Sequence, residues 1–125
     1  MTTTTLTPAA LAELYTVEDI KRIVEQACDA AYKAADVYEN DVMQGSWGAC
    51  GFAWVDICGI KGNTKIGRRL TQAGIGKDWT GRAYQIWNPS KYGTQNVDTL
   101  EAGARAAADV FKKYGFTAYA GSRLD

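Results

Sequence analysis

GSWGACGFAWVDICGI, residues 45–60, is the part of the chain from which the rest of the architecture follows. Most of its even-numbered positions carry large side chains, whereas its odd-numbered positions carry mostly small ones. Side chains alternate between the two faces of a strand, so this pattern predicts a central strand with another element packed closely on its small face. The bulky set is Cys50, Phe52, Trp54, Cys58 and Ile60, and the small set is Ala49, Gly51, Ala53, Val55 and Ile57.

Two helices are predicted before this strand. Thr7 and Pro8 precede AALAELY, an order typical of a capping residue followed by a proline in the first turn. Thr16 and Asp19 have the spacing of a capping box, which opens a longer helix that fades before Gly45. The apolar stripe of this longer helix is Ile20, Val24, Ala27, Ala31, Ala34 and Tyr38.

Two further helices and two further strands are predicted after the central strand. They are a turn and short helix over 61–74, a strand over 82–87, a helix over 98–114 and a strand over 116–120. Gly74 and Gly115 end the two helices, as glycine commonly does. The last five residues, GSRLD, are expected to form a polar, frayed tail. The inward positions are Ile66, Leu70 and Ala73 in the short helix and Leu100, Ala104, Ala107 and Phe111 in the last helix.

The resulting order, α-α-β-α-β-α-β, predicts an α+β fold in which helices cover a small three- to four-stranded sheet. Residues 1–125 are interpreted as a single domain, with residues 1–6 flexible. A small sheet leaves open edges and a partly exposed face, which proteins usually cover. Because residues 45–59 and 102–108 are also rich in Ala and Gly, which permits close contact, we expect a homo-oligomer, either a dimer or a hexamer.

Composition argues against several functional classes. The chain has no histidine, which removes the commonest metal ligand and the usual general base, and so argues against a triad hydrolase. Cys28, Cys50 and Cys58 fit neither a disulfide framework nor a zinc site, and we expect three buried free thiols. The chain shows neither a spanning apolar run nor a signal peptide. We therefore expect a cytoplasmic protein without membrane contact, metal or cofactor.

The net charge of zero hides a division of charge along the chain. Residues 1–60 hold three basic and nine acidic residues, whereas residues 61–125 hold eleven basic and five acidic residues. This asymmetry indicates an anionic partner for the basic half, or else a solvated acidic helix beside a solvated basic face. The chain lacks basic runs flanked by aromatic residues, which argues against a long nucleic acid and favours a small phosphorylated ligand.

The first candidate site is KGNTKIGRR, residues 61–69, where a glycine-containing turn leads into a helix with four cations. Amides at a helix N-terminus, together with lysine or arginine, form a natural anion site. The stretch is not a Walker motif, and the alternative is a polar turn with a solvated basic face. The candidate ligand residues are Lys61, Asn63, Thr64 and Arg68.

The second candidate site is WNPSKYGTQN, residues 87–96. Its indole is suited to stacking on a base, and its side-chain amides donate and accept hydrogen bonds at a base edge or a ribose. The alternative is a proline turn in which Asn96 or Asp98 caps the following helix. The candidate ligand residues are Trp87, Asn88, Gln95 and Asn96.

The C-terminal GSRLD, residues 121–125, supplies a third group of candidates. Arg123 is suited to bidentate contact with a phosphate, and the alternative is a surface arginine paired with Asp125. Ser122 and Arg105 are further candidate ligand residues. Either Arg105 or Arg123 is expected to meet the phosphates.

Taken together, CGFAWV, KGNTKIGR, WNPS, QN, the alanine-rich helix and AYAGSRLD resemble the phage Thoeris anti-defence sponge family, from about residue 45 to the end. The resemblance implies a phage protein that binds cyclic ADP-ribose isomers made by bacterial immune TIR enzymes, without cleaving them, and that works as an oligomer. For some members it also implies a separate site for cyclic oligonucleotides. The family's ligand contacts include an aromatic residue on adenine and a nearby asparagine, roles that Trp87 and Asn96 match best.

Two other functions stay open. One is an enzyme acting on a nucleotide or its phosphoester, although no pair of acids has convincing metal-ligand spacing. The other is direct inhibition of a host factor through the acidic N-terminal helix. The acids of the first alternative are Asp56, Asp78, Asp98 and Glu101. Those of the second are Glu25, Asp29 and Asp36.

Overall fold

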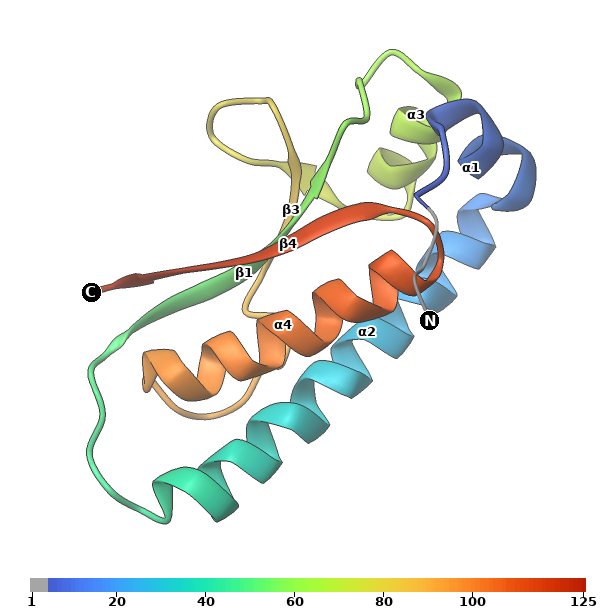
Figure 1. Cartoon of the computed structure of the whole chain (residues 1–125). Coiled ribbons are helices and arrows are strands. Elements are labelled where there is room, and N and C mark those ends of the chain that lie inside the picture. Colours follow the sequence, from blue (N-terminus) through green and yellow to red (C-terminus); the bar gives the residue numbers. More distant parts are fainter. Residues whose placement is uncertain (1–4) are drawn as a thin grey trace.

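The structure is a computed structural model that describes residues 5–125. The elements are α1 (Pro8–Leu14), α2 (Val17–Tyr38), the π-helix η1 (Glu39–Met43), β1 (Gly51–Cys58), α3 (Lys65–Gln72), β2 (Gly76–Lys77), β3 (Tyr84–Trp87), α4 (Val97–Lys113) and β4 (Thr117–Leu124) (Figure 1). The predicted α+β class and the order α-α-β-α-β-α-β are confirmed. The structure adds η1 and the short strand β2.

The N-terminal segment joins the fold at Leu6. Its backbone N–H donates to the carbonyl of Gly115 at 2.8 Å, and its side chain packs against the core. The flexibility expected for residues 1–4 lies outside the described residues.

The four strands form one antiparallel sheet in the order β2-β3-β1-β4. The connection β1-α3-β2-β3-α4-β4 with this strand order is the split β-α-β topology. The expected frayed tail is wrong, because GSRL belongs to β4. This strand pairs with β1 along its whole length, from Thr117 opposite Cys58 to Leu124 opposite Gly51. Backbone pairing thus orders a segment whose side chains are weak strand formers.

The helices cover one face of the sheet. α4 packs on β1 and β4, and α2 packs on α4 (Figure 1). The odd-numbered residues of β1 are buried beneath α4, which confirms the predicted close packing on the small face. A Cβ at Gly51 would lie 2.8 Å from the Cβ of Val97 at the start of α4, so this approach requires a glycine. The even-numbered face of β1 has no described helix over it.

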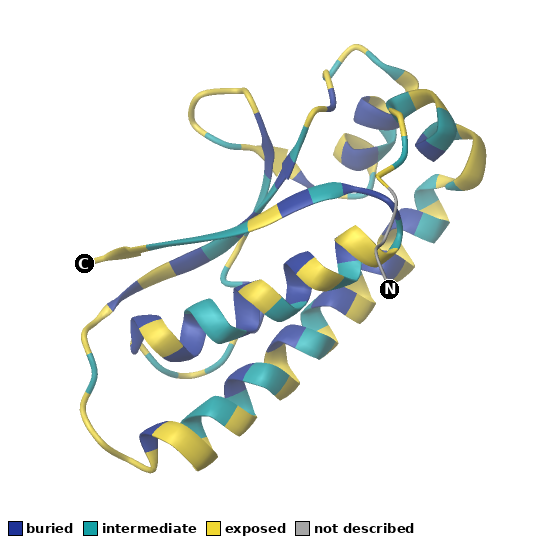
Figure 2. Cartoon of the chain, in the orientation of Figure 1, coloured by how far each residue is buried: buried dark blue, intermediate teal, exposed yellow. Residues whose placement is uncertain are grey.

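The predicted buried stripe is correct for α4 and only partly correct for α2. Every predicted inward residue of α4 is buried, and Figure 2 shows the buried positions of α2 and α4 turned toward the core. In α2 the predicted Val24, Ala34 and Tyr38 are only half-buried, and Ile23 and Ala35 are buried in their place. α2 packs mainly against α4, and this contact selects the side of α2 that is buried.

The small residues of α4 serve the chain's own packing. A Cβ at Gly103 would lie 3.0 Å from the carbonyl oxygen of Ala31 and 2.8 Å from the Cβ of Ser90. The small side chains of residues 102–108 therefore bring α4 close to α2. Oligomerisation itself stays a prediction.

None of the helices in the described chain combines the length and the apolar character needed to cross a membrane.

The capping box predicted at the start of α2 is present. The N–H of Asp19 donates to Thr16 Oγ1 at 3.2 Å, and the N–H of Thr16 donates to Asp19 Oδ2 at 2.9 Å. The Thr16 backbone N–H and the Thr16 hydroxyl, which donates to Asp19 Oδ2 at 3.0 Å, hold the pKa of Asp19 below its usual value, with a smaller contribution from Arg22.

Replacing Asp19 by asparagine is expected to lower the melting temperature at pH 7. The folded-state pKa of Asp19 lies below its ordinary value of 3.8, so its carboxylate stabilises the fold above that pH. This contribution is lost as the pH falls through the folded-state pKa. Thermal unfolding should therefore show a gap between the melting temperatures of the two proteins at pH 7 that narrows as the pH is lowered below 3.8. A gap of unchanged size over this pH range would show that the charge of Asp19 does not contribute.

Candidate functional site

The uncovered face of the sheet carries a cluster that we call the aromatic face, made of Phe52, Trp54, Trp87 and Arg123. Trp54 on β1 pairs directly with Trp87 on β3, and their ring centroids lie 5.2 Å apart. The rings of Phe52 and Trp87 lie 5.9 Å apart, edge to face. The guanidinium of Arg123, opposite Phe52 on β4, lies 5.4 Å from the Phe52 ring and 5.9 Å from the Trp87 ring. Three strands thus gather three rings and one cation.

Hydrogen bonds hold both indoles of the aromatic face in place. Trp87 Nε1 donates to Gln85 Oε1 at 2.5 Å, and Gln85 Nε2 donates to Asp56 Oδ1 at 3.0 Å. Trp54 Nε1 donates to the other carboxylate oxygen, Asp56 Oδ2, at 3.1 Å. Because both indole N–H groups have partners within the chain, the rings present their π-faces in a fixed orientation. A surface ordered in advance costs less to order when a ligand binds.

A glycine on β4 makes room for one of these rings. Gly121 lies opposite Trp54, and a Cβ there would come within 2.5 Å of the indole Cε2 atom. The indole therefore lies against the backbone of β4. Trp87 keeps 50% and Phe52 keeps 39% of their surface exposed. Large apolar side chains gathered on an uncovered face are characteristic of binding surfaces.

Two polar residues of the predicted site border the same surface. Trp87, Asn88, Gln95 and Phe52 line a hollow of about 150 Å³ together with Ala53 of β1 and Leu100 of α4, which belong to the core. Asn88 has a left-handed backbone, with φ 43°, at the point where the chain leaves β3. The structure therefore brings together Trp87, Asn88 and Gln95 in one hollow, with Arg123 beside Trp87.

Asn96 has a structural role. Its side-chain oxygen accepts from the N–H of Thr99 at 3.0 Å and so caps α4, and its amide nitrogen lies 3.8 Å from the sulfur of Met43. The side chain is buried. The helix-cap alternative to base recognition is thus the arrangement seen. Asn96 borders a separate hollow of about 230 Å³ that Gln95 and Trp47 also line.

The cationic turn between β1 and α3 lies apart from the aromatic face. β1 continues four residues past Trp54, about 14 Å at 3.4 Å per residue, before this turn begins. Thr64 caps α3 by accepting from the N–H of Gly67 at 3.1 Å, and Arg68 donates to the carbonyl of Asn63 at 2.8 Å. Lys61 is exposed. These four predicted ligand residues are together, but they do not join Trp87.

Arg105 and Ser122 meet at a third place, beside β4. Ser122 Oγ donates to Glu101 Oε2 at 2.6 Å, and the guanidinium of Arg105 forms an ion pair with the same carboxylate. Glu101 thus joins the last strand to α4.

The three cysteines are free, but the prediction that all three are buried is wrong. Cys50 is exposed, and Cys28 and Cys58 are half-buried. Cys58 lies on the uncovered side of β1. Burial raises the pKa of the Cys58 thiol, and the nearby carboxylates of Asp56 and Asp78 raise it further. The thiolate form is therefore disfavoured.

The acids of the two alternative functions are dispersed. Within residues 5–125, no group of three His, Cys, Asp or Glu side chains is placed to hold a metal ion. Glu25 and Asp29 are exposed on α2, whereas Asp36 accepts from the hydroxyl of Tyr92 at 2.9 Å.

Sequence reasoning proposed Trp87 and Arg123 but missed Phe52, Trp54, Asp56 and Gln85 as parts of the same surface. The available signal was the row of large side chains at even-numbered positions of the central strand, which placed Phe52 and Trp54 on one face. Comparison of the chain with family models, with curated proteins and with solved structures finds no match.

Proposed function

We propose that the protein binds a small anionic nucleotide without covalent chemistry, with its base stacked on the aromatic face. The observation that carries this proposal is the uncovered aromatic face, where the guanidinium of Arg123 lies beside the rings of Phe52 and Trp87, and Trp54 packs against Trp87. Stacking of one base on an aromatic ring contributes about 1–3 kcal/mol. A guanidinium beside the ring offers paired donors to a phosphate.

The charge of the aromatic face favours a small ligand over a long nucleic acid. Arg123 supplies one positive charge, and Asp56 places a carboxylate within the same face. A long nucleic acid is held mainly by several lysines and arginines along its backbone. One or two phosphates on a small nucleotide match a single guanidinium better.

In a cell, this activity would be that of a phage anti-defence protein that sequesters a cyclic nucleotide immune signal in the cytoplasm of the infected bacterium. The resemblance to the Thoeris anti-defence sponges supports a cyclic ADP-ribose isomer as the ligand, with cyclic oligonucleotides as further ligands. Such a protein needs no cofactor and leaves its ligand intact.

The direct test is calorimetry of the full chain with cyclic ADP-ribose isomers, cyclic dinucleotides and linear ADP. The expected result is saturable binding of a cyclic nucleotide that chromatography recovers unchanged after heat denaturation of the protein. Incubation with Mg²⁺ belongs in the same experiment, since formation of a product would establish a phosphoesterase instead. Failure of every nucleotide to bind would remove the proposal.

The inhibitor alternative has its own control in α2. Glu25→Gln with Asp29→Asn removes two exposed charges far along the chain from the aromatic face. This double variant should bind the nucleotide with unchanged affinity. If it instead abolishes anti-defence activity while nucleotide binding persists, the acidic helix carries the function.

A further inference from the structure

The outer edge of β4 is long, and no strand within residues 5–125 pairs with it. β4 is the last strand of the sheet, and its eight residues pair with β1 in an unbroken register on one side only. The opposite edge of the sheet, β2, has only two residues. Proteins usually protect an edge with proline, lysine, a bulge or a covering element. The sequence of β4, TAYAGSRL, contains no proline or lysine.

α4 carries a row of alternating charges. Glu101, Arg105, Asp109 and Lys112 follow one another along the helix as negative, positive, negative and positive. Within the chain they form two ion pairs, Arg105 with Glu101 and Lys112 with Asp109. Arg105 and Asp109, in the middle of the row, are exposed. Exposed pairs of this kind contribute little to the stability of a single chain.

This row runs beside the free edge of the sheet. At one end, Glu101 accepts from Ser122 Oγ at 2.6 Å. At the other end, Lys112 Nζ lies 5.8 Å from the ring centroid of Tyr119. Both contacts are with β4, so the charged row and the unpaired strand edge form one continuous surface.

We propose that a second copy of this chain docks on this surface, with β4 antiparallel to β4 of the partner and α4 beside α4 of the partner. A two-fold axis through the middle of the row places the partner's row antiparallel to this one, so that each charge faces a charge of opposite sign. Arg105 then faces Asp109 of the partner subunit, and Glu101 faces Lys112 of the partner subunit. The surface is thus complementary to itself, which commits its occupant to a second copy.

One two-fold axis serves both elements. The ends of the charged row lie beside Ser122 and Tyr119, so its middle lies beside Ala120 and Gly121, at the middle of β4. Directly opposed residues in an antiparallel pair share one face of the sheet. Either Ala120 or Gly121 must therefore face its own counterpart across the axis.

The spacing of the two layers fits the same arrangement. α4 contacts both β4 and β1, which places it above the space between these strands. With strands about 4.8 Å apart, the two copies of α4 would lie about 10 Å apart, within the usual range for packed helices. The axis is perpendicular to the sheet, so both aromatic faces lie on one side of a continuous eight-stranded sheet. This interface does not depend on the nucleotide.

The test is sedimentation equilibrium of the full chain, whose expected mass is twice the 13.6 kDa of one chain. Arg105→Asp places an aspartate opposite Asp109 of the partner subunit, and the two-fold axis produces this repulsion twice. The dimer dissociation constant should therefore rise about tenfold or more. Adding Asp109→Arg restores opposite charges across the axis and should recover the dimer. Arg82→Asp makes the same charge reversal on the β2–β3 hairpin, at the other edge of the sheet, and should leave the dimer unchanged.

Hydrogen exchange tests the strand edge separately. Outward-facing amides of β4 should exchange more slowly at high than at low protein concentration, and this difference should vanish in Arg105→Asp. A wild-type chain that stays monomeric at about 100 μM would overturn the proposal, since specific dimers are well populated there. A dimer that Arg105→Asp leaves intact, with no concentration effect on β4, would overturn it as well.

Discussion

Replacing Trp87 by alanine is expected to weaken nucleotide binding roughly ten- to a hundredfold, because a base stacked on an aromatic ring gains about 1–3 kcal/mol and 1.4 kcal/mol is tenfold. The indole is half exposed and is fixed by its hydrogen bond to Gln85. It also forms the middle of the aromatic face, in contact with Trp54 and Phe52. Isothermal titration calorimetry on protein shown to be folded by circular dichroism measures the loss.

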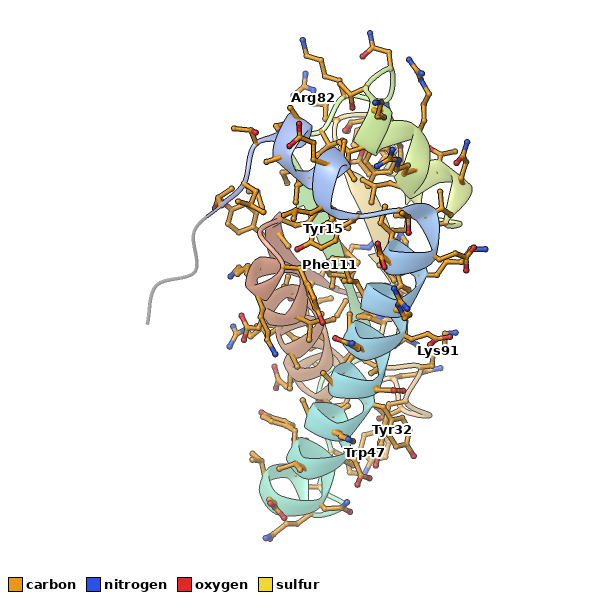
Figure 3. The ribbon with its side chains drawn as sticks, turned by 90° about the vertical axis from the view of Figure 1, so that its right-hand side faces the viewer. Tyr15, Tyr32, Trp47, Arg82, Lys91 and Phe111 are labelled. Atoms are coloured by element: carbon orange, nitrogen blue, oxygen red, sulfur yellow. The ribbon has the colours of Figure 1, made fainter. Side chains whose placement is uncertain are left out.

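The chain offers two matched tryptophan controls. Trp47 and Trp79 are 97% and 95% exposed and lie outside the aromatic face. Figure 3 places Trp47 at the opposite end of the molecule from Arg82, which lies on the hairpin that carries Trp79. Trp79→Ala and Trp47→Ala should bind as the parent protein does. Unchanged binding by Trp87→Ala would reduce the segment 87–96 to a turn and a helix cap.

The same titrations distinguish the two cationic regions. Arg123→Ala removes the guanidinium next to Trp87, and it should weaken binding about tenfold or more and make the remaining affinity less sensitive to salt. Arg68→Ala removes an equal charge from the distant turn after β1, where the side chain donates to a backbone carbonyl. Its affinity should stay close to that of the parent. The opposite ranking would place the phosphates at the turn.

Replacing Phe111 by alanine is expected to lower the free energy of unfolding by about 3–5 kcal/mol, the usual cost of removing a large buried aromatic side chain. Phe111 is fully buried in α4 and packs edge to face against Phe116, with ring centroids 5.8 Å apart. It belongs to the same buried core as Ile20 and Ile23 of α2, so its removal leaves a cavity in the core. Urea denaturation should show a lower midpoint with an unchanged slope.

Phe52→Ala is the matched control for this loss. It removes the same side chain from the aromatic face, where 39% of its surface is already exposed. The expected cost is about 1 kcal/mol or less, since less surface returns to water. Equal destabilisation by the two changes would mean that the uncovered face is buried in solution. That result would itself indicate a partner on the aromatic face.

Helix boundaries were readable from the sequence. Thr7 caps α1, and Thr16 forms a capping box with Asp19 at the start of α2, as predicted. Gly115, with φ 94°, follows α4 and ends it. These signals act over three or four residues of one segment, so no knowledge of distant contacts is needed.

Strand pairing was much less readable. The alternation in β1 correctly identified a small face that is packed closely and a bulky face opposite it. It did not show that the bulky face stays uncovered. The segment 121–124 carries glycine, serine and arginine, and its place in β4 comes from hydrogen bonding to β1. Weak local preference was overridden by a long neighbouring strand.

In the candidate site, individual residues could be predicted from the sequence, but their grouping could not. Composition pointed to Trp87 and Arg123 separately, but the register of three strands puts the guanidinium over the ring and sets Trp54 beside it. Asn96 looked equally suited to a base or to a helix end, and the start of α4 uses it as a cap. Helix periodicity and helix caps depend on interactions within a few residues, so the sequence of each segment is enough to predict them. The uncovered face, the strand register and the grouping of the site depend on contacts between segments far apart in the chain, which exist only once the sheet has formed.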